Sequence, residues 1–344
     1  MSSEAIERVE KAIDVIKRGR MVIMMDDEDR ENEGDLVYAA TFSTPEMVNF
    51  MAKEARGLIC TPLTGEIARR LELVPMVERN DSQHETAFTV SIDAATAKTG
   101  ISAAERSTCI SLLASPVSKS DDFVRPGHIF PLIAKDGGVL VRTGHTEGSV
   151  DLCKLAGLAP VAVICEIIKD DGTMARRDDL REFSAEHAMP IVYISDIVEY
   201  RLANEQLVRR IGEEEIEFNG VGVTRIDYED HLKRRHTVIQ FYKVHESENV
   251  RFHNIGSDID LLLDEKRFHA MKESIDYLRR NGGLLIFLDS KSVSKEQAKE
   301  IGVGAQILKD LGVKSIKLLT TNVETEFVGL SGFGLDVVEK IGIG

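Results

Sequence analysis

The sequence has few cysteines and no tryptophan. Only four of its 344 residues are cysteine, and none of them shows the Cys-x-x-Cys spacing of zinc sites or dithiol redox sites. This usage excludes a disulfide-stabilised scaffold and is typical of a protein of the reducing cytoplasm. The cysteines are Cys60, Cys109, Cys153 and Cys165, so the whole chain after residue 165 lacks thiols.

Positive charge and long apolar runs are also scarce. The chain carries 43 Lys and Arg against 58 Asp and Glu, which gives a formal net charge of −15. Because such a charge repels phosphate backbones, we expect no nucleic acid partner. The most apolar stretch, 158–168, is shorter than the roughly 18 residues of a membrane span and contains Glu166, so we expect no membrane association.

Strand and helix patterns alternate along the chain, which predicts an α/β or α+β fold. The first twenty residues predict an amphipathic helix that ends near Gly19, not a secretory signal. Further strands are predicted at 21–25, 36–40, 139–141, 161–165 and 191–194, and helices at 45–55, 65–71 and 149–155.

The pattern changes near residue 200. Residues 196–220 form a polar helical pattern followed by three consecutive acids, and a new alternating segment begins at 236. Strand patterns at 284–288 and 316–319 then enclose a helical pattern at 294–311. We therefore expect two domains, a mixed-sheet α/β domain at 1–201 and a second α/β domain at 202–344.

An acidic segment follows the first predicted strand. Residues 26–35 read DDEDRENEGD, with seven carboxylates in ten positions around Arg30. Two carboxylates about 4 Å apart repel by roughly 4 kcal/mol near a protein surface, so such a loop needs protonation, a basic partner or a bound cation. Oxygen ligands favour Mg²⁺, Mn²⁺ or Ca²⁺ over zinc. The alternative is a solvated acidic hairpin, which the charge pattern alone favours.

The segment RTGHTEG at 142–148 has the outline of an anion site. Arg142 offers a cationic fork, and the following residues lead into a helix N-terminus with its free N–H groups. Capping by Thr146 or Ser149 explains part of this pattern without a ligand. His145 is a candidate metal ligand beside the acidic loop, although a histidine in a turn is more often simply exposed.

Two further residues are candidates for proton transfer. His128 follows an expected Pro-Gly turn in RPGHIFPL and is either a proton-transfer group or a half-buried residue with satisfied hydrogen bonds. Glu166 ends an apolar run, where an ionised carboxylate is costly to bury without a partner. The alternative for Glu166 is a position at the strand end that faces water.

Together these motifs resemble the 3,4-dihydroxy-2-butanone 4-phosphate synthase family of riboflavin biosynthesis. The resemblance extends over about residues 5–200. One difference is Glu105, where the family usually has Asp. The matching segments are DDEDRENEGDL (26–36), GLIC (57–60), TAFTVSIDA (86–94), TGISAAERSTCI (99–110), RPGHIFPL (125–132), RTGHTEG (142–148) and the CEI that contains Glu166.

The resemblance implies a lyase that converts D-ribulose 5-phosphate to L-3,4-dihydroxy-2-butanone 4-phosphate and formate. It implies Mg²⁺ or Mn²⁺ held by Glu31 and His145, and substrate contacts by Arg30, Asp35 and Glu166. His128 and Glu166 are implied to be essential for the chemistry, and a loop at 80–92 to form a lid. The family is homodimeric, so His128 is expected to act across the subunit interface. The implied phosphate-binding residues are Arg142, Thr143, Gly144, His145 and Thr146.

The second half resembles GTP cyclohydrolase II in residues 301–322 and 330–343, but it lacks that enzyme's active-site residues. The enzyme needs three cysteine thiolates on zinc, and this half has no cysteine, so we expect no zinc. The family's catalytic loop is replaced at 288–294, and its acid and arginine by Gln297 and Lys299. A substitute zinc site at His245, His253 and Asp258 would not restore these groups.

Three hypotheses follow. The first is a lyase with a catalytically inactive C-terminal domain. The second is a bifunctional enzyme that also has GTP cyclohydrolase II activity. The third is a regulatory or binding protein in which the acidic loop holds a structural cation.

Overall fold

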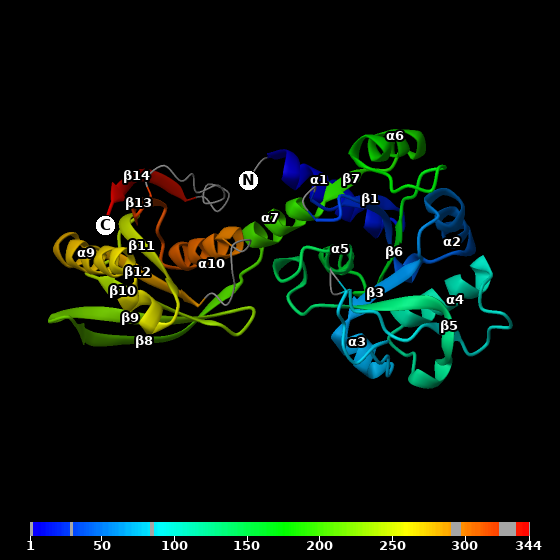
Figure 1. Cartoon of the computed structure of the whole chain (residues 1–344), viewed down its shortest axis with the longest axis horizontal. Helices are drawn as coiled ribbons and strands as arrows, with labels where there is room; N and C mark the ends of the chain where they lie inside the picture. Colours follow the sequence, from blue (N-terminus) through cyan, green and yellow to red (C-terminus); the bar gives the residue numbers. More distant parts are fainter. Residues whose placement is uncertain (1–2, 28–29, 83–85, 290–296, 323–334, 344) are drawn as a thin grey trace. The chain divides into compact units, whose positions relative to one another are not determined.

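The computed structural model describes residues 3–27, 30–82, 86–289, 297–322 and 335–343 (Figure 1). The chain forms two compact units, which divide between Tyr200 and Arg201. Each unit is built on a seven-stranded mixed sheet, which confirms the predicted α/β class. None of the helices in the described part combines the length and apolar character that a membrane span requires.

The sheet of the N-terminal unit has the strand order β4-β5-β3-β6-β2-β1-β7. Strand β1 pairs antiparallel with β2 and parallel with β7, and β6 pairs antiparallel with β2 and β3. The strands are β1 (Val22–Met25), β2 (Gly34–Ala39), β3 (Cys60–Thr64), β4 (Ile92–Ala94), β5 (Phe123–Ala134), β6 (Ala162–Glu166) and β7 (Ile191–Tyr193).

Helices cover both faces of this sheet, because its central strands are apolar on both sides. In β1, Ile23 and Met25 belong to one core cluster while Val22 and Met24 belong to the other. Helices α1 and α5 contact one another and pack on the face of the sheet that carries Val22 and Met24. The helices are α1 (Ser3–Lys17), α2 (Pro45–Phe50), α3 (Gly65–Arg70), α4 (Ala103–Ala114), α5 (His145–Leu155), α6 (Arg177–His187) and α7 (Ile194–Asn204).

Most local predictions for this unit are confirmed. Helix α1 buries Ala5, Val9 and Ala12, and the chain leaves it at Gly19, whose φ is 69°. The segment predicted as one helix over 45–55 is α2 followed by a π-helical turn, Met51–Ala55.

Three local predictions are wrong. The strand expected at 139–141 is a 3₁₀ turn, Gly138–Leu140, because Gly137 and Gly138 both take positive φ and turn the chain. The turn expected at Pro126 and Gly127 is part of strand β5. Helix α5 begins at His145, not near Ser149.

The C-terminal unit has the strand order β14-β13-β11-β12-β10-β9-β8. The pairs β8–β9, β9–β10 and β10–β12 are antiparallel. The pairs β12–β11, β11–β13 and β13–β14 are parallel. The strands are β8 (Val208–Phe218), β9 (Val221–Asp230), β10 (Arg235–Phe241), β11 (Ser247–Ile255), β12 (Gly283–Asp289), β13 (Ser315–Thr320) and β14 (Asp336–Gly342).

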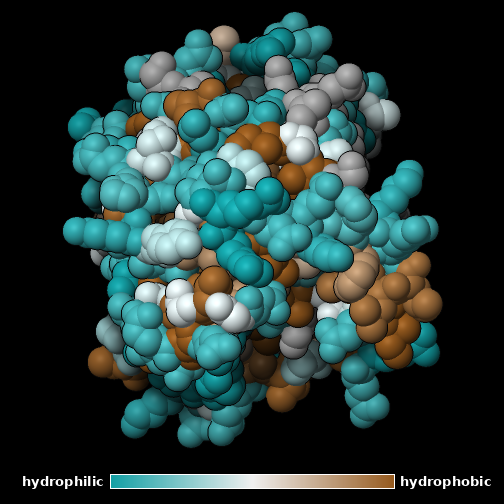
Figure 2. All heavy atoms as spheres, turned by 90° about the vertical axis from the view of Figure 1, so that its left-hand side faces the viewer, coloured by the Kyte–Doolittle hydropathy of each residue, from teal (hydrophilic) through white to brown (hydrophobic). Residues whose placement is uncertain are grey.

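Helices α9 (Glu265–Asn281) and α10 (Gln297–Asp310) pack on this sheet, and α8 (Asp258–Leu263) precedes α9. The predicted helix at 294–311 corresponds to α10, although residues 294–296 lie outside the described residues. Helix α8 leaves Ile259, Leu262 and Leu263 exposed. Figure 2 shows a mainly hydrophilic face of this unit, with scattered apolar side chains and one larger apolar patch at the lower right.

Candidate functional site

The acidic segment folds around Asp26, which directly follows β1. The side chain of Asp26 is fully buried and accepts hydrogen bonds from the backbone N–H groups of Glu31, at 3.1 Å, and Glu33, at 2.8 Å. Arg30 donates to Asp26 at 2.7 Å and to Glu31 at 2.8 Å. The repulsion between these acids is therefore partly offset by backbone donors and one arginine, and the segment is not simply a solvated hairpin.

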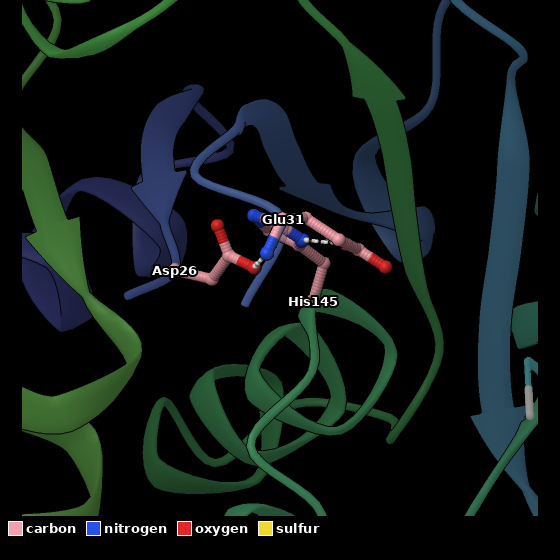
Figure 3. A group of neighbouring side chains, drawn as sticks. All are labelled: Asp26, Glu31 and His145. Carbon is pink, nitrogen blue, oxygen red and sulfur yellow. Dashed lines mark hydrogen bonds and ion pairs between the residues drawn. The ribbon is translucent and has the colours of Figure 1, made fainter. Parts of the chain in front are cut away.

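His145, the first residue of α5, points at this loop (Figure 3). Its Nδ1 lies 3.7 Å from the Glu31 Oε2, and its Nε2 lies 3.9 Å from the Asp35 Oδ1. Asp26, Glu31 and His145 each offer one ligand atom, and these atoms lie within 4.8 Å of one another. Across the described ranges, this is the one group of three or more His, Cys, Asp and Glu residues with the geometry to hold a metal ion.

Two buried polar atoms at this group have no hydrogen-bond partner among the described residues. They are His145 Nε2 and Asp35 Oδ1, on side chains that are 7% and 3% exposed. Buried polar atoms are normally satisfied, so this pair indicates a site for a polar ligand or ion. The mixed nitrogen and carboxylate donors fit Mg²⁺ or Mn²⁺.

The pKa values in this group are displaced by burial and by the concentration of acids. The pKa of Asp35 is raised to about 7, and burial is the largest cause. His145 opposes this rise, whereas Glu166, Glu31 and Glu33 add to it. Burial lowers the pKa of His145, but Asp35, Glu31 and Asp26 outweigh burial and raise it to about 9. The site therefore attracts positive charge.

Glu166 lies at the end of β6, directly opposite Asp35 in β2. Its Oε2 accepts a hydrogen bond from the backbone N–H of Leu58, at 2.8 Å. A Cβ at Gly57 would collide with the backbone and carboxylate of Glu166, so only glycine fits here. The GLIC segment thus holds the Glu166 carboxylate in place.

The anion site predicted at 142–146 is built around a fixed arginine. Arg142 donates through Nη1 to the Glu147 carboxylate, at 2.5 Å, and through Nη2 to the Thr86 hydroxyl, at 3.2 Å. A Cβ at Gly144 would collide with the Arg142 guanidinium. Gly144 is also the N-cap of α5, without a side-chain cap, so the expected capping by Thr146 or Ser149 is wrong. The N–H groups at the start of a helix have no acceptor within the helix, so those of the first turn of α5 can donate to an anion.

Seven of the predicted site residues line one cavity of about 160 Å³. An adjoining cavity of about 730 Å³ is lined by residues of the 75–82 loop together with Glu31, Thr86 and Lys135. Residues 83–85, in the loop predicted as a lid, lie outside the described residues. The seven predicted residues are Arg30, Glu31, Asp35, Arg142, His145, Thr146 and Glu166.

Three predicted residues do not line this cavity. Thr143 and Gly144 lie in the turn before α5. His128 lies on β5, where its side chain is 43% exposed and its Nδ1 lies 2.8 Å from the buried carboxylate of Asp93. In the tautomer whose Nδ1–H donates to Asp93, Nε2 is left as the proton acceptor of the imidazole.

Sequence reasoning missed several residues of the site. Asp26 is one of seven acids in residues 26–35, and no local sequence pattern indicates that this acid, directly after β1, is buried. Glu147 was read as part of a motif, yet it is a buried carboxylate that fixes Arg142. Cys60, Thr86 and Phe88 also line the cavity. They lie in the matching segments GLIC and TAFTVSIDA, but no chemical pattern singles them out within these segments.

The chain is similar to several known proteins. The family model described as 3,4-dihydroxy-2-butanone 4-phosphate synthase matches residues 10–200, and the model for GTP cyclohydrolase II matches residues 289–342. A 3,4-dihydroxy-2-butanone 4-phosphate synthase of Wolinella succinogenes is 57% identical over 98% of this chain and 97% of its own length.

Two solved structures are also similar. RibBX of A. baumannii, described as a two domain 3,4-dihydroxy-2-butanone 4-phosphate synthase, is 38% identical with a TM-score of 0.81, and the match covers 97% of this chain and 98% of that one. A 3,4-dihydroxy-2-butanone 4-phosphate synthase in complex with two magnesium ions is 41% identical with a TM-score of 0.54. That match covers 56% of this chain and 95% of the other.

Proposed function

The chain belongs to the 3,4-dihydroxy-2-butanone 4-phosphate synthase family, and from this premise we propose a magnesium-dependent lyase of riboflavin biosynthesis. Its substrate is D-ribulose 5-phosphate, and its products are L-3,4-dihydroxy-2-butanone 4-phosphate and formate. The observation that carries the proposal is that two buried atoms, His145 Nε2 and Asp35 Oδ1, have no hydrogen-bond partner among the residues that the structure describes. Both residues line a cavity together with other motif residues of the family.

Glu31 and His145 hold the metal ion in this proposal, and Asp26 orients the Glu31 segment through its backbone N–H groups. A bound Mg²⁺ or Mn²⁺ supplies a Lewis acid that makes the proton next to the sugar's ketone more acidic. The solved relative with two magnesium ions supports this choice of metal. Carboxylate and imidazole donors without thiolates make zinc the less suitable ion.

The phosphate end of the substrate binds at Arg142, at Thr143 and Gly144 before α5, and at His145 and Thr146 in the first turn of α5. Arg142 is already held by Glu147 and Thr86, so little side-chain freedom is lost when an anion binds. Arg30 and Asp35 contact the sugar part, one as a hydrogen-bond donor and the other as an acceptor.

Glu166 and His128 move protons in this proposal. Glu166 lines the cavity and is held by the N–H of Leu58, within reach of a bound sugar. His128 is oriented by Asp93 but lies outside the cavity of its own chain. We therefore propose a homodimer in which His128 of each subunit completes the site of the other.

The C-terminal unit is catalytically inactive toward GTP in this proposal. Only residues 289–342 match the GTP cyclohydrolase II model, and the unit contains no cysteine for a thiolate zinc site. The side chains of Gln297 and Lys299 lie outside the described residues. The four free, buried cysteines of the N-terminal unit favour the cytoplasm as the compartment.

Formate release tests the proposal, because both candidate activities release it. The purified chain is given ribulose 5-phosphate or GTP, each with Mg²⁺ or with chelator. We expect formate from ribulose 5-phosphate only, and none after chelation. Formate from GTP would establish the bifunctional alternative. If neither substrate gave formate, the result would instead favour a regulatory or binding protein with a structural cation.

A further inference from the structure

An arginine far along the chain reaches the acidic loop. Arg176, the N-cap of α6, donates through Nη1 to the backbone carbonyls of Glu31, at 2.6 Å, and Asn32, at 2.5 Å. The same nitrogen lies 3.8 Å from the Glu33 carboxylate. One guanidinium therefore contacts three consecutive residues of the segment that carries the candidate metal ligand Glu31.

The backbone of this segment needs such a contact. Asn32 adopts a φ of 55°, which turns the chain between Glu31 and Glu33. Two neighbouring carbonyl oxygens then face the same nitrogen, although carbonyl dipoles aligned side by side repel each other. A cationic donor between them stabilises this arrangement, and charged donors form the stronger hydrogen bonds.

The backbone next to Arg176 is anchored to the segment that follows Glu166. The residue before it, Ala175, is buried and donates its N–H to the carbonyl of Ile167, the residue after Glu166. The N–H of Arg176 donates to Asp179, in the first turn of α6. Arg176 thus connects the segment after Glu166 with the segment that contains Glu31.

We infer that Arg176 is a positioning residue that holds the Glu31 segment in the conformation required for metal binding. The inference rests on the metal centre proposed above and extends it to a residue that does not touch the metal. Arg176 acts through backbone carbonyls, so its side chain needs neither contact with substrate nor a place in the cavity.

Geometry and charge make opposite predictions for this residue. Arg176 is a positive charge beside an acidic cation site, so by charge alone its removal would strengthen cation binding. If Arg176 positions Glu31, its removal weakens cation binding, because the segment no longer keeps its conformation. The sign of the change in affinity therefore separates the two roles.

The experiment measures Mn²⁺ binding to the full chain, with free Mn²⁺ followed by electron paramagnetic resonance. Arg176→Ala removes the contact, and Arg176→Lys keeps the charge but not the planar fork. Arg177→Ala is the matched control, since it removes the same charge from the exposed neighbouring residue. Circular dichroism confirms that each variant is folded, and hydrogen exchange of residues 26–35 without metal reports the loop directly.

We expect Mn²⁺ affinity to fall at least about 10-fold in Arg176→Ala, with faster exchange of residues 26–35, because groups that orient metal ligands are commonly worth 10- to 100-fold in affinity. The Mn²⁺ affinity of Arg176→Lys is expected to fall less, and that of Arg177→Ala to stay within about twofold of the unmodified chain.

If Arg176→Ala does not fold, the Mn²⁺ affinity of Arg176→Lys is the test, and weakened binding again supports the role of Arg176. Unchanged or tighter binding in the folded variants would overturn the role of Arg176 alone. If the unmodified chain bound no Mn²⁺, the proposed metal centre would fail with it.

Discussion

Asp35 and Glu166 lie directly opposite each other in the antiparallel pair of β2 and β6. Opposed side chains in such a pair have Cβ atoms about 5 Å apart, and like charges there are destabilising. Asp35 is buried, and this burial, with a contribution from Glu166, raises its pKa. The two strands thus place two carboxylates together at the cost of stability, which is the arrangement expected where a cation or a polar substrate binds.

Replacing Asp35 with Asn separates this cost from its function. In chelator at pH 8, we expect Asp35→Asn to raise the Tm by a few degrees, because a carboxylate beside three others becomes neutral. Formate release from ribulose 5-phosphate is expected to fall at least about 100-fold. Differential scanning fluorimetry and the formate assay measure the two effects.

The control is Asp121→Asn, the same change at an exposed position in the same unit. We expect it to leave both the Tm and the rate unchanged. A lower Tm in Asp35→Asn would contradict the account of the site as an electrostatically strained cluster.

Gly57→Ala tests how closely the GLIC segment must approach Glu166. The added Cβ would collide with the Glu166 backbone and carboxylate, so either the segment or the carboxylate has to move. We expect activity to fall about 10- to 100-fold, since small displacements of a catalytic group have effects of this size. Gly222→Ala is the control, because a Cβ there meets nothing within 4 Å. Equal activity in the two variants would argue against a fixed position for Glu166.

The sequence predicted which residues belong to this site better than it predicted how their side chains are arranged. The strands that end next to Asp26, Asp35 and Glu166 are short apolar segments, and their pattern is local. The opposition of Asp35 and Glu166 depends on the register between two strands far apart in the chain, and no local pattern encodes it. This is why seven motif residues could be named while their contacts could not.

Burial and backbone conformation explain the remaining differences. Charge pattern alone favoured a solvated acidic hairpin, yet Asp26 and Asp35 are buried, because backbone N–H groups, Arg30 and His145 surround them. The apolar triplet at 139–141 resembled a strand, but two glycines with positive φ precede it. His128 is expected from the resemblance to act across a subunit interface, and β5 carries it outside the cavity of its own chain.

Glu105 makes stability depend on pH. Its carboxylate accepts hydrogen bonds from the N–H of Lys98 and from the hydroxyls of Ser102 and Thr99, and the Lys98 and Ser102 bonds lead in lowering its pKa to about 2. A lowered pKa stabilises the folded state above the ordinary value of about 4.5, and this contribution is lost as the pH falls toward 2.

We therefore expect Glu105→Gln to be less stable than the unmodified chain at pH 7, with a smaller difference at pH 3.5. Urea unfolding followed by circular dichroism at both pH values measures this. Glu66→Gln, in the first turn of α3, is the control with the same loss of charge. A difference that stayed constant or grew toward low pH would show that Glu105 does not act as an ionised acceptor.

The proposed homodimer predicts that two inactive variants restore activity when mixed. If His128 completes the partner's cavity, a mixed dimer of His128→Ala and Glu166→Gln has one cavity with both defects and one with none. Random exchange of subunits gives half mixed dimers, so we expect about a quarter of the unmodified activity, as for any site shared between subunits.

The control pair is Glu166→Gln with His145→Asn. Both residues line the same cavity, so every site stays defective and no activity should return. Both pairs are mixed in mild urea and dialysed, and formate release is then measured. If neither mixture regained activity, His128 would act within its own subunit or outside catalysis.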